Sequence, residues 1–136
     1  MKFFTSSMAL LLATVSWASA QSRSFNTLAE LASYMGADRE QVLFEGAKVE
    51  GKVVWYTSLS GGSYKALATA FEAKYPGVGV EVYRAPGSDL ALRMTEEAQA
   101  RRNIVDALET TQDTLVSLRE AGLLGAFNSP YIRSYS

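Results

Sequence analysis

Hydrophobic and polar positions change their period along the chain. Between residues 27 and 51, apolar residues three and four apart predict two short helices. The first begins at Thr27, whose spacing to Glu30 fits a capping box, and the second begins at Asp38. Gly51 is typical of a helix end. The segment from residue 21 to residue 52 is therefore expected to be helical and to precede a different architecture.

From residue 53 the pattern alternates between strands and helices. Strands are predicted over residues 53–57, 78–83 and 104–108. Each is followed by apolar positions at helical spacing, over residues 64–75, 90–98 and 115–121. The first strand lacks polar alternation, so both of its faces are expected to be buried. This order predicts an α/β fold, a parallel three-stranded βαβαβα sheet with right-handed crossovers.

Residues 1–20 have the features of a secretory signal peptide. Lys2 supplies the positive start, residues 8–15 form a short apolar stretch, and Ala18-Ser19-Ala20 fits a cleavage site. A buried helix or a membrane anchor is the alternative interpretation, although the apolar stretch is short for a bilayer. We expect cleavage after Ala20 and a periplasmic product. The chain has no cysteine, so no thioether-linked lipid anchor is expected.

Composition excludes several kinds of chemistry. The 136 residues include no histidine and no cysteine, which excludes Ser–His and Cys–His nucleophilic sites and His/Cys metal centres within this chain. The net charge of −1 gives no indication of a nucleic-acid partner. No catalytic residue, cofactor or resident metal is predicted. Apolar residues continue to the end of the sequence, so residues 53–136 are expected to be a partial α/β lobe whose second lobe is absent.

The candidate chemistry lies in the turns that follow the strands. In an open parallel sheet, ligands bind beyond the carboxyl ends of the strands. These turns are rich in hydroxyl groups, which suit a small polar or anionic ligand. The predicted ligand-binding residues are Thr57, Ser58, Ser60, Arg84, Thr110 and Thr111. Alternatively, Ser63, Ser88 and Thr111 serve only as helix caps, and Arg84 is a solvated surface residue.

Several stretches are similar, in order and spacing, to a known family. They are residues 45–58 (EGAKVEGKVVWYTS), 70–77 (AFEAKYPG), 80–84 (VEVYR), 106–110 (DALET) and 122–124 (GLL). Over roughly residues 25–131 the chain resembles the extracellular solute-binding proteins of ABC importers, in the ferric-iron-type subfamily. The resemblance implies the first part of lobe 1 of a type II periplasmic binding protein. It also implies a small-molecule ligand, a permease partner in the inner membrane, and no enzymatic activity.

The chain departs from the iron-binding members of this family. Those members use a histidine in the first turn and a glutamate in the third, where this chain has Ser60 and Thr111. Hydroxyl groups are poor replacements for such metal ligands. The resemblance therefore implies import of a phosphonate, a carboxylate or an iron complex.

Two other functions stay open at the level of sequence. A small α/β hydrolase would have to use carboxylates such as Glu81, Asp106 and Glu109. A truncated interaction module would pair through an exposed sheet edge. Glu96, Glu97, Arg101 and Arg102 lie at helical spacing and predict a solvated charged face rather than a site.

Overall fold

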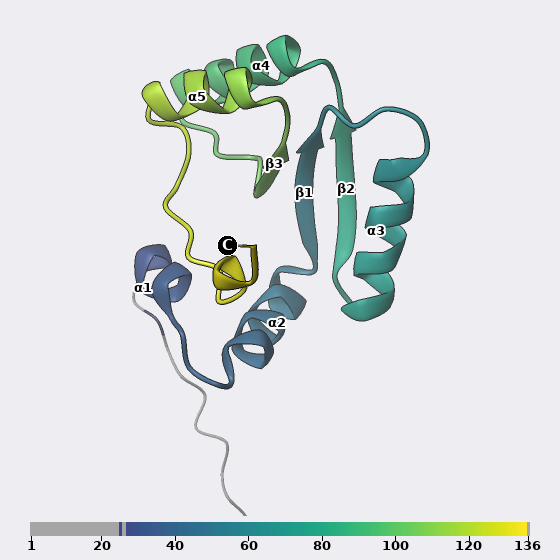
Figure 1. Ribbon diagram of the computed structural model, residues 1–136, viewed down its shortest axis with the longest axis vertical. Helices are drawn as coiled ribbons and strands as arrows, with labels where there is room; N and C mark the ends of the chain where they lie inside the picture. Colours follow the sequence, from purple (N-terminus) through teal and green to yellow (C-terminus); the bar gives the residue numbers. More distant parts are fainter. Residues whose placement is uncertain (1–24, 26, 136) are drawn as a thin grey trace, which may run out of the picture.

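The computed structural model describes residue 25 and residues 27–135 (Figure 1). The predicted signal peptide, residues 1–20, lies outside the described residues. The elements are α1 (Leu28–Ser33), α2 (Arg39–Glu50), β1 (Lys52–Thr57), α3 (Ser63–Lys74), β2 (Gly79–Arg84), α4 (Gly87–Gln99), β3 (Ala107–Glu109), α5 (Gln112–Glu120) and a 3₁₀ helix (Ile132–Tyr135). This order confirms the predicted α/β fold, in which two helices precede a βαβαβα unit.

The sheet has three parallel strands in the order β2-β1-β3. Strand β3 is shorter than predicted, because the side chain of Asp106 replaces part of the backbone pairing. Val54 donates its amide to Asp106 Oδ2 at 2.8 Å, and Asp106 donates its own amide to Val54 O at 3.0 Å. The register of β3 with β1 therefore starts at Ala107, which lies opposite Trp55.

The helix ends follow the sequence in part. Thr27 caps α1 as predicted and accepts a bond from the Glu30 amide at 3.2 Å. Gly51 ends α2 in the left-handed conformation, with φ of 79°. Ser63 and Ser88 are not caps, because Gly62 and Pro86 occupy the N-cap positions of α3 and α4. The cap interpretation therefore fails for these two serines.

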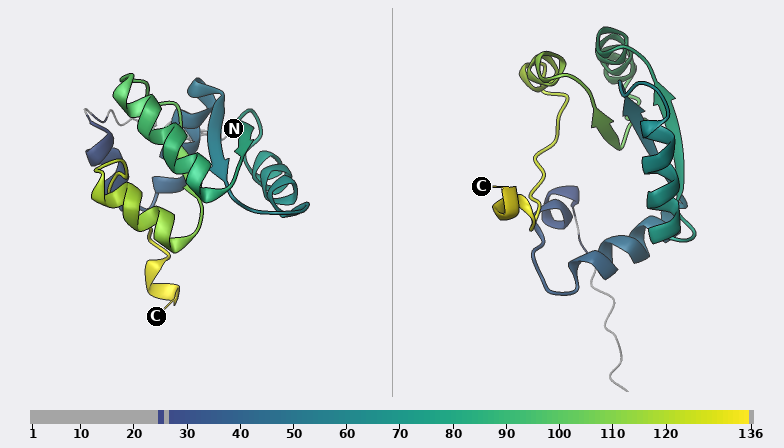
Figure 2. Two further views of the ribbon diagram at one scale, coloured as in Figure 1. Left: turned by 90° about the horizontal axis from the view of Figure 1, so that it is seen from above. Right: turned by 45° about the vertical axis from the view of Figure 1, so that its right-hand side comes forward.

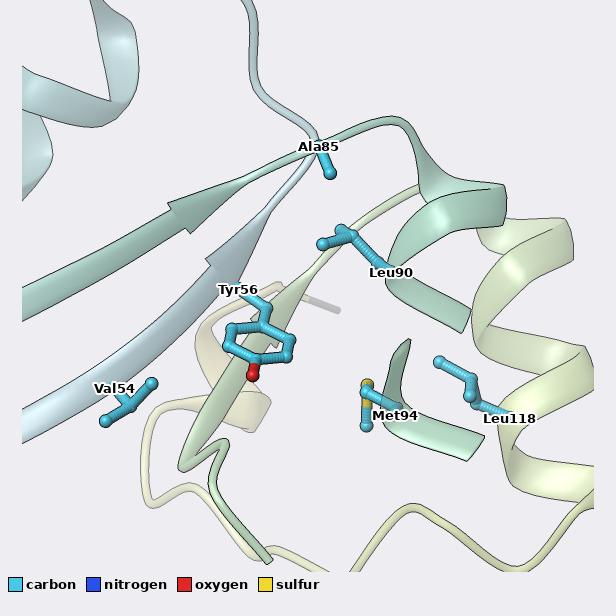
Figure 3. Close-up of a cluster of buried hydrophobic side chains, with 6 residues drawn as sticks. All are labelled: Val54, Tyr56, Ala85, Leu90, Met94 and Leu118. Atoms are coloured by element: carbon cyan, nitrogen blue, oxygen red, sulfur yellow. The ribbon is translucent and has the colours of Figure 1, made fainter. Parts of the chain in front are cut away.

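The core lies between one face of the sheet and the helices α4 and α5. Figure 3 shows its members converging from β1, from α4, from α5 and from the residue that follows β2. They are Val54, Tyr56, Ala85, Leu90, Met94 and Leu118. Leu90 and Leu118 are almost completely buried; α4 packs on β1, and α5 packs on α4.

The opposite face of the sheet is less covered than predicted. Helix α3 packs beside β2 (Figure 2, right), and its apolar residues Leu67 and Phe71 remain 54% and 36% exposed. Val53 and Trp55, on β1, are only half-buried. The prediction that β1 is buried on both faces is therefore wrong, because α3 lies along β2 rather than over β1.

Candidate ligand-binding rim

The strand register brings the three predicted turns to one edge of the sheet. Thr57 lies opposite Arg84 on one side and Glu109 on the other. The amide of Ala85 donates to Thr57 O at 3.1 Å, and the amide of Ser58 donates to Glu109 O at 3.1 Å. We call this edge the rim, formed by residues 58–62, 84–88 and 109–111. It lies at the carboxyl ends of the strands, next to the starts of α4 and α5 (Figure 1).

A single carboxylate holds the first turn of the rim. Glu109 Oε2 accepts a bond from Thr57 Oγ1 at 2.6 Å and bonds from the amides of Ser58 and Leu59 at 3.2 Å each. Thr57 is completely buried, and its oxygen also accepts the Leu59 amide at 3.1 Å. Thr57 therefore lies behind the rim, where its hydroxyl positions Glu109 and the turn.

Polar groups on the open side of the rim keep unused hydrogen-bonding capacity. Ser60 is exposed and Ser58 is half-buried. Arg84 is exposed and donates from Nε to Leu59 O at 3.1 Å, so its side chain lies across the first turn. Arg84 has no carboxylate partner among the described residues. Its guanidinium is therefore a positioned cation at the rim.

Three threonine hydroxyls surround the start of α4. A Cβ atom placed on Gly87 would lie 2.6 Å from Thr114 Oγ1, 2.8 Å from Thr110 Oγ1 and 3.4 Å from Thr111 Oγ1. Glycine at this position is thus what allows α4 to approach α5 so closely. The Thr110 hydroxyl is buried and has no hydrogen-bond partner in the described structure. Thr111 is the N-cap of α5, but its oxygen bonds Thr114 Oγ1 at 3.1 Å instead of a backbone amide.

An acidic side chain already occupies the start of α5. A hydrogen bond from the Thr111 hydroxyl, followed by one from the Thr114 backbone, holds the pKa of Asp113 below its usual range. An anionic ligand would have to compete with this carboxylate at the start of α5. Helix α4 is similar, because Asp89 lies in its first turn and accepts the Ser88 hydroxyl at 3.2 Å, so an anion would compete with a carboxylate at the start of either helix.

The carboxylates considered for an enzyme all have structural partners. Glu81 pairs with Lys52 at 2.5 Å, Asp106 accepts the Val54 amide, and Glu109 accepts three bonds in the first turn. Each therefore already has a partner within the chain. Residues 25 and 27–135 contain no group of three or more acidic, histidine or cysteine side chains that could hold a metal ion. Within the same residues, no helix combines the length and apolar character needed to cross a bilayer.

The sequence missed a polar cluster beside the core. Glu97 was expected on a solvated face, but its side chain is only 12% exposed. Its Oε1 accepts bonds from Tyr56 Oη at 2.6 Å and Arg93 Nε at 2.8 Å. The Arg93 guanidinium carbon also lies 4.0 Å from the centre of the Tyr83 ring. The expectation for Glu97 is therefore wrong, because α4 turns this residue toward the tyrosine of β1.

Comparison with known proteins gives a partial match. No model of a known protein family matches the chain, and no curated protein matches it. Among solved structures, the crystal structure of iron-bound HitA from Pseudomonas aeruginosa matches with a TM-score of 0.50 and 29% identity. The match covers 58% of this chain and 25% of HitA, so it spans about a quarter of the length of that protein. The likeness supports the fold of a solute-binding protein for this chain.

Proposed function

We propose that the chain is part of a periplasmic solute-binding protein that captures a small polar or anionic solute for an ABC importer. The observation that carries the proposal is the convergence of the three turns at one edge of the sheet, in a chain whose fold is similar to part of HitA. In this class of fold, ligands bind where the carboxyl ends of parallel strands meet. Glu81, Asp106 and Glu109 already have partners within the fold, which favours binding over catalysis.

We assign the rim residues either direct contacts with the solute or a supporting role behind the rim. Ser58, Ser60 and Thr111 present hydroxyls or amides to the solute, Thr110 contributes through its backbone because its hydroxyl is buried, and Arg84 supplies the positive charge. Thr57 acts indirectly, because its buried hydroxyl is used by Glu109. The exposed position of Arg84 and its single bond to Leu59 O leave its Nη groups available to an anion.

The proposed ligand is an organic anion rather than a bare metal ion. HitA is iron-bound, but the described residues of this chain offer no cluster of metal ligands. Serine and threonine hydroxyls with one arginine match the donors that a phosphonate or a carboxylate requires. An iron complex could bind through such groups on its organic part.

Nuclear magnetic resonance titration tests the proposed function. The ¹⁵N-labelled chain is titrated with methylphosphonate, citrate and ferric citrate. We expect shifts confined to the amides of residues 58–60, 84–85, 87–88 and 109–111 with one of the three. Arg84→Gln should weaken that binding at least roughly tenfold, since it removes a charged hydrogen-bond donor.

Arg119→Gln is the matched control, because Arg119 is an exposed arginine in the last turn of α5. It should leave the titration unchanged. Absence of shifts at the rim with all three ligands, or equal binding by the Arg84→Gln variant, would contradict the proposed site.

The cellular setting is also part of the proposal. Residues 1–20 would direct export to the periplasm, with cleavage after Ala20, and an inner-membrane permease would receive the solute. The remainder of lobe 1 and a second lobe would complete the cleft. Coding sequence for such a lobe, in frame after Ser136, supports this arrangement, whereas a stop codon at that point contradicts it.

A further inference from the structure

A second concave surface lies at the opposite end of the sheet from the rim. It is a groove of about 480 Å³ between the α1–α2 connection, helix α2, the end of α3 and residues 130–131. Val78, which directly precedes β2, also lines it, so the groove lies at the amino ends of the strands. Figure 1 shows α2 at this end and the rim at the other. The groove therefore belongs to a separate site.

The floor of the groove is apolar. Its apolar side chains come from three parts of the chain that are distant in sequence, residues 35–44, 71–78 and 131. They are Met35, Leu43, Phe44, Phe71, Val78 and Tyr131. Met35 and Tyr131 are 51% and 62% exposed, so this surface stays open. Its volume falls within the usual range for small-molecule pockets, which is roughly 300–1,000 Å³.

The charged groups at the border of the groove leave one cation unmatched. Glu40 pairs with Lys74 at 2.7 Å and accepts the Tyr75 hydroxyl at 2.9 Å. The bond with Lys74 holds the pKa of Glu40 below its usual range. Arg39 has no carboxylate partner among the described residues. The charges of Glu40 and Lys74 offset each other, so Arg39 is the cation at the border of the groove that lacks a carboxylate partner among the described residues.

Arg39 is also held in position. Its Nε donates to Tyr34 O at 2.7 Å, and its Nη2 donates to Asn128 O at 3.2 Å. Its guanidinium carbon lies 5.4 Å from the centre of the Phe127 ring. Nη1 makes no hydrogen bond to the described residues. A fixed guanidinium with a free nitrogen, at the end of an apolar floor, is complementary to an anion that carries an apolar body.

We propose that this groove binds a hydrophobic carboxylic acid, with its apolar body on the α2–α3 floor and its carboxylate on Arg39. The inference goes beyond the proposed function, because it concerns a different ligand class at the other end of the sheet. A neutral apolar ligand would leave the guanidinium without a partner. A small polar anion would leave the apolar floor uncovered. The combination of both features favours an amphipathic acid.

The test is an NMR titration of the full chain with sodium octanoate, sodium hexanoate and 1-octanol, each below its aggregation concentration. We expect octanoate to shift the amides of Leu43, Phe44, Phe71 and Tyr131 while the rim amides stay in place. Hexanoate should bind roughly fifteenfold more weakly, at about fourfold per methylene. The alcohol should bind at least about tenfold more weakly, because it lacks the carboxylate.

Two variants distinguish binding in the groove from non-specific binding of octanoate to the protein surface. Arg39→Gln should weaken octanoate binding at least about tenfold, whereas Arg119→Gln should not change it. Because Arg39 also ties α2 to Tyr34 and Asn128, Ala47→Phe is a second variant that fills the groove and keeps the arginine. It should abolish octanoate binding while circular dichroism stays unchanged.

Three outcomes would overturn the proposal. The first is equal binding of octanoate and 1-octanol, which would indicate a non-specific apolar surface. The second is absence of any shift in the groove. The third is a shift of groove amides with protein concentration alone, which would show that a second copy of the chain covers the groove. Loss of rim binding would bear only on the proposed function, because its reporter amides lie at residues 58–60, 84–85, 87–88 and 109–111.

Discussion

Thr57 Oγ1 donates a 2.6 Å hydrogen bond to Glu109 Oε2 and so joins the end of β1 to the end of β3. Glu109 Oε2 also accepts hydrogen bonds from the amides of Ser58 and Leu59. An ionised carboxylate accepts such bonds well, and hydrogen bonds to charged groups are the stronger ones. The shape of the first turn of the rim therefore depends on one glutamate from the neighbouring strand.

Substitution of this glutamate should loosen the turn. Glu109→Gln replaces an ionised acceptor of three bonds with a neutral amide group. We expect the free energy of unfolding to fall by roughly 1–3 kcal/mol, measured by urea denaturation. Glu120→Gln, an exposed change near the end of α5, should stay within about 0.5 kcal/mol of the original chain.

A double-mutant cycle with Thr57→Val separates the direct bond from its surroundings. We expect a coupling energy of about 0.5–3 kcal/mol between the two positions. Additive effects of the two substitutions would contradict the role given to this bond.

Replacement of Gly87 by alanine, the smallest side chain, should destabilise the fold. Gly87→Ala would place a Cβ 2.6 Å from Thr114 Oγ1 and 2.8 Å from Thr110 Oγ1. Relief of this contact requires α4 and α5 to separate, or the β-branched threonines to leave their preferred rotamers. We expect a net loss of roughly 1–2 kcal/mol, although alanine has the better helix propensity. Thermal or urea denaturation measures it.

Gly46 provides the matched control for this substitution. It lies inside α2, and nothing lies within 4 Å of a Cβ placed there. Gly46→Ala should therefore raise the free energy of unfolding by about 0.5–1 kcal/mol. Opposite signs at the two glycines are the expected result, and the same sign at both would refute the close approach of α4 and α5.

Stability should decline in alkaline solution because of Tyr56. Burial, and then the hydrogen bond to Glu97, raises the pKa of the Tyr56 phenol above its ordinary value. Below about pH 10 both folded and unfolded chains keep this proton, and the contribution is complete. As the pH rises further, the unfolded chain ionises first, so the free energy of unfolding falls by up to about 1.4 kcal/mol per pH unit.

The contribution of Tyr56 is measured by comparing urea denaturation at about pH 8 and about pH 11. In Tyr56→Phe, the free energy of unfolding should fall less between the two pH values than in the original chain. Tyr135→Phe should keep the full decline, because Tyr135 is 90% exposed. An unchanged decline in Tyr56→Phe would contradict the assignment.

Two ion pairs of this chain should differ in their contribution to stability. Glu97 is mostly buried, and the Arg93 pKa is raised chiefly by its hydrogen bond with Glu97. Arg93→Gln leaves that carboxylate without its cation, so we expect a loss of roughly 1–3 kcal/mol. Lys52 and Glu81 are each 60% exposed, and Lys52→Gln should cost less than about 1 kcal/mol. Equal losses in urea denaturation would contradict this ranking.

Local sequence patterns predict most of the order of strands and helices. The β-branched run of residues 53–57, the alternating valines of 78–82 and the helical spacing between them predict the strand and helix order that is observed. Strand β3 was predicted too long, because a periodic pattern does not reveal that the Asp106 side chain replaces backbone pairing. The same limit applies to Ser63 and Ser88, whose cap positions are taken by Gly62 and Pro86.

The sequence by itself determined the fold class, the excluded chemistries and the three hydroxyl-rich turns, because these depend on periodicity and on which residue types are present. Only the tertiary structure decided that Thr57 is buried behind Glu109, that Glu97 turns toward Tyr56, and that Arg39 faces an apolar groove. The reason is physical. Tyr56 and Glu97 are 41 positions apart, Thr57 and Glu109 are 52 apart, and the groove brings Arg39 together with residues as distant as Tyr131. Their distances are set by strand register and helix packing, which no local pattern encodes.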